Sequence, residues 1–252
     1  MSAPAEMNEA PQKKKSRFFL GFLSVLAVGF FALFLGLGIW QVERLQWKLD
    51  LIARVDARVH AEPVAAPGRD DWANVNQAED EYRHVVLTGT YLNDKEVLVR
   101  ALTERGSGFW VLTPMSSDDG ALTFINRGFI PDARRDPALR VETQIAGETT
   151  VTGLLRMPEP DGFFLRPNDP DRDEWNSRDV VAFATKEGLG TVAPYFIDAD
   201  AKSNPGNVPI GGLTVVTFRN NHLSYAITWF ALAAMVAGAA IFVWRHERKP
   251  KD

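Results

Sequence analysis

Histidine and cysteine are the side chains that most often ligate metals, and this chain has four histidines and no cysteine. The lack of cysteine excludes disulfides, thiolate metal sites and thiol redox chemistry. His60 lies in a proline-rich linker, His84 in a strand-like segment and His246 in a basic tail. His222 differs because an uncharged apolar run begins directly after it. Its imidazole is therefore the strongest candidate for binding chemistry.

Three short motifs imitate enzyme or metal sites but lack the residues that would make them work. The Gly-Ser-Gly of residues 106–108 lacks the flanking pattern of a nucleophile elbow, and the glycines of 188–193 follow a predicted helix instead of a strand. The alternating aspartates of 169–173 resemble a calcium loop. However, Glu174 stands in place of the turn glycine and Val180 in place of the closing glutamate. We therefore predict that the protein is not an enzyme and that the acidic stretch is a solvated turn.

Two uncharged runs predict the elements that must position His222. Residues 18–40 and 223–244 contain 23 and 22 residues. As helices they reach roughly 33–35 Å, enough to cross a hydrocarbon core of about 30 Å. In lipid such runs must be helical, because no water is present to pair with the backbone. A cleavable signal peptide is the alternative for the first run. We expect the run to be retained, because it is longer than a signal core and ends in Gly-Ile-Trp-Gln, a poor cleavage site.

Charge predicts the orientation of the two spans. The tails before and after them each carry a net charge of +2. Because the whole chain has a net charge of −4, the segment between the spans must carry −8. Basic flanks stay on the cytoplasmic side, so we expect both termini in the cytoplasm. The protein would then be a multi-pass protein of the bacterial inner membrane, in contact with lipids and with its main domain in the periplasm. In the alternative, it lies in the mitochondrial inner membrane with that domain in the intermembrane space. An acidic outer segment also gives no footprint for nucleic acid.

The pattern between the spans predicts one β-rich domain. Short segments rich in Val, Leu, Thr and aromatic residues alternate with Gly, Pro, Asp and Asn, which is typical of an antiparallel sheet or barrel. The predicted strands are 84–91, 96–102, 108–113, 122–126, 149–155 and 213–219. We expect a hairpin turn at 118–120, and a helix over 179–187 that is capped by Asn176 or Ser177 and ends at Gly188.

The predicted fold class is therefore a membrane protein with two transmembrane helices that flank one antiparallel β-rich domain. The predicted parts are a tail (1–17), a first span (18–40), an outer domain (41–222, with the first helix continuing to about residue 58), a second span (223–244) and a second tail (245–252).

Several sequence blocks together resemble one known family. They are Gly38–Lys48, Gly108–Pro114, Asn126–Pro131, Gly153–Arg156 with Pro158-Glu159, Pro167–Pro170 with Trp175 and Arg178-Asp179, and Asn221–Trp229. In this order, and over about residues 36–233, they resemble the Surfeit locus protein 1 family.

The resemblance implies a non-enzymatic factor for the assembly of haem–copper terminal oxidases such as cytochrome c oxidase. It implies that haem a is the transient cofactor, and that oxidase subunit I and haem a synthase are partners. Two alternatives remain at this stage: a scaffold that does not bind haem, and a permanent accessory subunit of the oxidase.

A haem carrier needs an axial donor, apolar walls and cations for the propionates, and the outer mouth of the two spans offers all three. The predicted site consists of His222 as the iron ligand, Tyr225 and Trp229 on its helix face, Trp40 and Arg44 on the first span, and Arg219 as a second cation. In the alternative interpretation, His222 only caps its helix and Arg44 only anchors the chain to lipid phosphates or pairs with an acidic residue.

Overall fold

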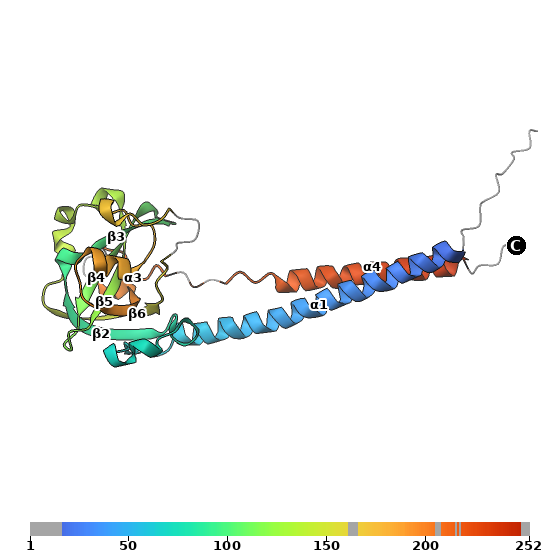
Figure 1. Ribbon diagram of the computed structural model, residues 1–252, viewed down its shortest axis with the longest axis horizontal. Coiled ribbons are helices and arrows are strands. Elements are labelled where there is room, and N and C mark those ends of the chain that lie inside the picture. Colours follow the sequence, from blue (N-terminus) through green and yellow to red (C-terminus); the bar gives the residue numbers. More distant parts are fainter. Residues whose placement is uncertain (1–16, 161–165, 205–207, 215, 217, 248–252) are drawn as a thin grey trace, which may run out of the picture. The chain divides into compact units, whose positions relative to one another are not determined.

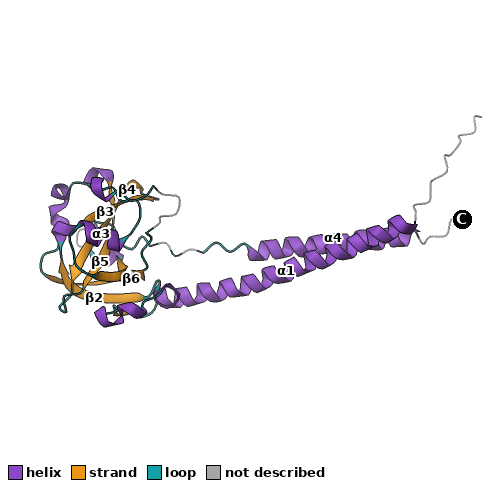
Figure 2. Ribbon diagram, viewed as in Figure 1, coloured by secondary structure: helices purple, strands orange, loops and turns teal. Residues whose placement is uncertain are grey.

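The computed structural model describes residues 17–160, 166–204, 208–214, 216 and 218–247, which form four α-helices, six short 3₁₀ helices and seven strands (Figure 1, Figure 2). The elements in chain order are α1 (Arg17–Val59), β1 (Val64–Ala65), α2 (Gln77–Asp80), β2 (His84–Tyr91), β3 (Val97–Thr103), β4 (Gly106–Ser116), β5 (Leu122–Pro131), β6 (Glu148–Arg156), α3 (Val180–Lys186), β7 (Val192–Ala199) and α4 (His222–Glu247). Contacts divide the chain into a helical unit, Met1–Leu51 with Phe218–Asp252, and a sheet unit, Ile52–Thr217.

In the helical unit, α1 and α4 lie side by side (Figure 1). The least exposed positions of α4 recur every three or four residues, as at Ala226, Trp229 and Ala233, which is the spacing of one helix face. Small residues allow close approach: a Cβ atom on Gly38 would lie 2.6 Å from the ring of Phe230. Both helices are long and apolar enough to cross a membrane, and they contain the two predicted spans. The first helix ends at Val59, one residue beyond the predicted extension.

In the sheet unit, the strands follow the order β1-β2-β6-β7-β5-β4-β3, and an additional pairing of β2 with β4 closes five of them into a small barrel. The prediction of a purely antiparallel sheet was wrong, because β1 pairs with β2 and β5 with β7 in parallel. Parallel neighbours need a long crossover, which β6 and α3 supply between β5 and β7.

Five predicted strands correspond to β2 through β6, and β2 has the predicted bounds. The strand predicted at 213–219 was wrong, because its described residues are irregular. The sequence analysis also missed β7. Ile197 of this strand faces the barrel interior while Phe196 faces α3, so both faces are buried. Its run Val-Ala-Pro-Tyr-Phe-Ile-Asp-Ala contains a proline, which argues against a strand when only the sequence is considered.

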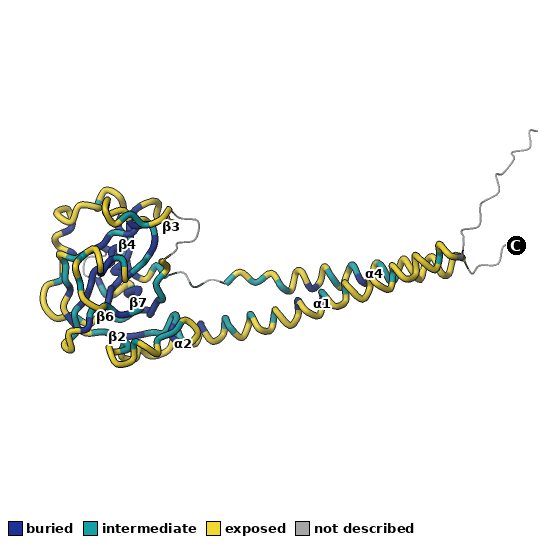
Figure 3. The backbone as a smooth tube through the Cα atoms, in the orientation of Figure 1, coloured by how far each residue is buried: buried dark blue, intermediate teal, exposed yellow. Residues whose placement is uncertain are grey.

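The core of the sheet unit has two sides, and its buried residues concentrate in the strands (Figure 3). On one side α3 covers the sheet, with Phe183 packed edge-on to Trp175 at 4.8 Å between ring centroids. The helix begins later than predicted. Asp179 caps it by accepting hydrogen bonds from the next backbone N–H groups, so the proposed caps Asn176 and Ser177 were wrong.

Candidate functional site

His222, the predicted ligand, is the first residue of α4 and is half-buried. Its Nδ1 lies 2.7 Å from Oε1 of Gln41 on α1. In the described part of the chain, its Nε2 has no hydrogen-bond partner. The pair thus engages one ring nitrogen and leaves the other available to an incoming group.

Gln41 was not among the predicted site residues, although it lies in one of the blocks that carried the family resemblance. It is buried on the face of α1 that meets α4, one turn from Gly38. A buried amide is stable only when it is hydrogen-bonded, and His222 supplies that bond. The signal available in the sequence was a glutamine at helical spacing from small and apolar positions, directly after an apolar run.

The predicted aromatic residues separate into two groups. The ring of Trp229 stacks on Phe34 of α1, with 5.7 Å between centroids, so this residue fastens the two helices together. Trp40 and Tyr225 are instead 48% and 54% exposed. Their rings are available as apolar surface outside the helix pair.

The predicted cations are near the same end of the helical unit. Arg44 holds its guanidinium 5.0 Å from the ring centroid of Trp47, one turn along α1, and Arg219 is exposed. Neither pairs with a carboxylate in the described chain. The sequence analysis missed a similar contact, the ammonium group of Lys48 over the ring of Phe218 at 4.7 Å.

This donor set limits which metal the site can hold. The described residues contain no group of three or more histidine, cysteine, aspartate or glutamate side chains that could hold an ion. One imidazole is sufficient only for a metal that brings its other ligands with it, as the iron of haem does. The residues present therefore fit a haem group better than a bare ion.

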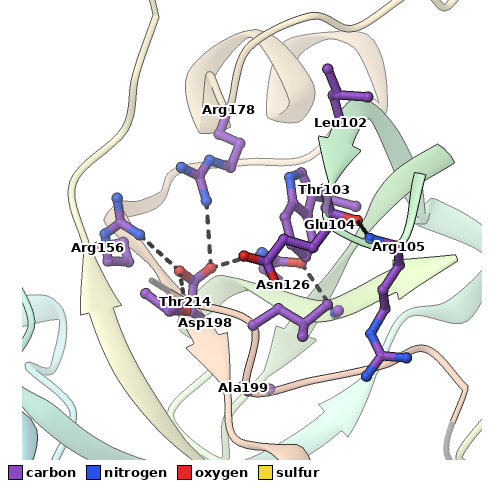
Figure 4. Close-up of a pocket in the computed structure, with 14 residues that line it drawn as sticks. Leu102, Thr103, Glu104, Arg105, Asn126, Arg156, Arg178, Asp198, Ala199 and Thr214 are labelled. Atoms are coloured by element: carbon purple, nitrogen blue, oxygen red, sulfur yellow. Dashed lines mark hydrogen bonds and ion pairs between the residues drawn. The ribbon is translucent and has the colours of Figure 1, made fainter. Parts of the chain in front are cut away.

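The sheet unit contains a second concentration of polar residues, centred on Asp198 of β7. The side chains of Arg156 and Arg178 point toward its carboxylate (Figure 4). Asp198 accepts hydrogen bonds from Arg156 at 2.9 Å, Asn126 at 2.7 Å and Thr214 at 2.8 Å. Arg178 is farther away, with 3.7 Å between the nearest nitrogen and oxygen.

Arg156 connects this carboxylate to two others. It donates to Glu81 at 2.8 Å and to Glu159 at 3.1 Å. Burial acts to lower the pKa of Arg156, but the nearby Asp198 and Glu81 carboxylates raise it above its ordinary value. The guanidinium therefore stays charged and holds β6, β7 and the loop before β2 together.

Residues of the Asp198 cluster line a pocket of about 690 Å³. The β3–β4 turn, Trp110 and residues that follow β7 also line it. Asn126, Arg156 and Arg178 belong to sequence blocks that are far apart in the chain, and only the fold brings them together. Asp198 was missed because β7 was missed.

The sheet unit also buries a cation that has no carboxylate partner within bonding distance among the described residues. Arg127 lies 4.9 Å from the ring centroid of Tyr91 and donates to Asn204 and to the carbonyl of Thr143. Burial lowers the pKa of Arg127, and burial also raises the pKa of Tyr91 to about 12. Both side chains are inside the barrel and belong to its core.

Comparisons with known proteins cover both the His222 site and the Asp198 cluster. Residues 28–234 match the model of the SURF1 family, a range that includes Gln41, Asp198 and His222. The chain belongs to the SURF1 family. It is 39% identical over 226 residues to Surfeit locus protein 1 of Homo sapiens, covering 83% of this chain and 72% of the human protein. It is 35% identical over 249 residues to a SURF1-like protein of Monosiga brevicollis, covering 94% and 91% of the two chains. The resemblance seen in the sequence blocks is thereby confirmed.

Proposed function

We propose that this SURF1 family member assists the assembly of a haem–copper oxidase by holding haem a at the outer mouth of the α1–α4 helix pair. The observation that carries the proposal is the imidazole of His222, which is anchored through Nδ1 while Nε2 remains without a partner in the described chain. An imidazole nitrogen is a common axial ligand of haem iron.

The surroundings of His222 supply what the rest of a haem needs. The exposed rings of Trp40 and Tyr225 offer apolar surface for a flat macrocycle. Arg44 and Arg219 carry charges that no described carboxylate neutralises, so they are available to propionates. When bound, the haem supplies the redox-active iron, and the protein supplies binding and orientation.

The proposed setting follows from charge and hydropathy. We place α1 and α4 in the inner membrane with both termini in the cytoplasm, because both tails are basic. The site then lies on the outer side of the membrane. The proposed recipient is the largest oxidase subunit, subunit I, and the proposed donor is haem a synthase. Both partners come from the family resemblance.

The test is the absorption spectrum of the purified full-length protein in detergent, titrated with haem a. Wild type should develop a Soret band that saturates at one haem per chain, and His222→Ala should lose it or shift it. His84→Ala is the matched control, because both nitrogens of His84 are already engaged, Nδ1 with the carbonyl of Ala61 at 2.8 Å and Nε2 with Asp200 at 3.2 Å. Its spectrum should match that of wild type.

A second variant separates ligation from charge. Arg44→Ala should weaken haem retention without changing the axial ligand, because a propionate contact is electrostatic. An unchanged spectrum in His222→Ala would refute ligation by this residue. A wild-type protein that takes up no haem a yet co-purifies with oxidase subunits would instead indicate a scaffold or an accessory subunit.

A further inference from the structure

The contact between Gln41 and His222 favours one tautomer of the histidine. Oε1 of Gln41 is a carbonyl oxygen and can only accept a hydrogen bond. In this structure that oxygen, and not the amide NH₂ group, lies 2.7 Å from Nδ1 of His222, so the contact is a hydrogen bond when Nδ1 is the donor. In the neutral imidazole one nitrogen bears the hydrogen and the other a lone pair, so the lone pair is on Nε2.

The position of Gln41 makes this contact persistent. The residue is 9% exposed, and the helix pair is held close by Gly38 against Phe230 and by Phe34 against Trp229. Breaking the bond would leave a buried amide oxygen without a partner, which is costly. The helix packing therefore keeps Oε1 beside the imidazole.

We propose that Gln41 is a positioning residue that holds His222 as the Nδ1–H tautomer, with Nε2 prepared to bind iron. The part that concerns iron rests on the proposed function, whereas the tautomer does not. Hydrogen bonds to the second nitrogen of a ligating histidine fix its tautomer and orientation and raise its basicity. A neutral amide raises the basicity less than a carboxylate does, which suits a site that must release its haem.

The tautomer can be tested without haem. The full-length protein is labelled with ¹⁵N-histidine and its nitrogen NMR signals are recorded in detergent at about pH 8.5. This pH is well above the ordinary histidine pKa of about 6.5. The chain has four histidines, and loss of a signal in His222→Ala identifies His222. We expect a protonated Nδ1 and an unprotonated Nε2, and the Gln41→Met variant should lose this preference.

Gln46→Met is the matched control, since Gln46 is an exposed glutamine on the same helix. It should leave the His222 signal unchanged. A wild-type signal with the proton on Nε2 would overturn the proposal, whether or not haem binds. So would a Gln41→Met signal identical to that of wild type.

The effect on iron is measured by the iron–imidazole stretching frequency of the reduced protein–haem complex and by haem affinity. Gln41→Met should weaken affinity about 10–100-fold, the usual range for losing such a partner. Gln41→Glu keeps an acceptor oxygen and strengthens it, so the stretching frequency should rise; this variant decides the matter if Gln41→Met does not accumulate.

The outcomes distinguish the two proposals. If His222→Ala removes ligation but neither Gln41 variant changes affinity or stretching frequency, the role of Gln41 is refuted and the haem site stands. If His222→Ala leaves the haem spectrum unchanged, the haem site is refuted, and the tautomer is judged by the nitrogen signals alone.

Discussion

Replacing Asp198 with asparagine should strongly destabilise the sheet unit. The carboxylate is 5% exposed and faces the guanidinium of Arg156, which is 10% exposed. It also accepts hydrogen bonds from Asn126 and Thr214. An amide has only one acceptor oxygen. In the variant its NH₂ group would face donors that have lost the carboxylate oxygen they bind in the wild type.

The expected cost follows from this burial. Removing one partner of a buried ion pair typically costs 3–5 kcal/mol, because the other charge remains buried without compensation. For a unit of this size, that corresponds to a fall in melting temperature of roughly 6–20 °C. Thr214→Val removes only one hydrogen bond to the same carboxylate and should cost about 1 kcal/mol.

The assay is thermal and urea unfolding of the full-length protein in detergent, followed by near-ultraviolet circular dichroism. Asp200→Asn is the matched control: it is two residues from Asp198, its side chain is 42% exposed, and it pairs with His84 at 3.2 Å. An exposed pair of this kind contributes about 0–1 kcal/mol. If Asp198→Asn lowers stability no more than Asp200→Asn does, the Asp198 cluster does not hold the sheet unit together.

Three further predictions follow from burial, backbone geometry and charge. Burial raises the pKa values of Tyr91 and Tyr195 to about 12. The stability that each contributes should therefore be intact below the unfolded pKa of about 10 and be lost as the pH rises toward 12. Alkaline unfolding monitored by tyrosine absorbance checks this, and titration of both side chains near pH 10 in the folded protein would contradict it. Gly128→Ala should destabilise the protein by more than about 1–3 kcal/mol, because φ is +126° and the new Cβ would lie 2.2 Å from the carbonyl oxygen of Ile210. Gly120→Ala is the control: its φ is +73°, but the new Cβ meets no atom within 4 Å, so it should cost less in the same denaturation assay. Alkaline phosphatase fused after Asp200 should be active in bacteria and fused at the C-terminus inactive; the reverse result would overturn the predicted orientation.

The sequence by itself determined the features that depend on local pattern. Length and hydropathy predicted α1 and α4, because a helix satisfies its own backbone and needs no distant partner. Short segments rich in Val, Leu, Thr and aromatic residues, separated by turn residues, predicted β2 through β6, and the order of the sequence blocks indicated the family. His222 was identified from its place beside an apolar run.

Only the tertiary structure decided which residues meet. The direction of β7, the partner of His222 and the cluster at Asp198 all depend on contacts between segments far apart in the chain: 181 residues separate Gln41 from His222, and 72 separate Asn126 from Asp198. β7 contains a proline in its run Val-Ala-Pro-Tyr-Phe-Ile-Asp-Ala, which argues against a strand when only the sequence is considered. A glutamine on a helix and an aspartate in an apolar strand acquire their roles only when folding removes water and places a specific donor within hydrogen-bond distance.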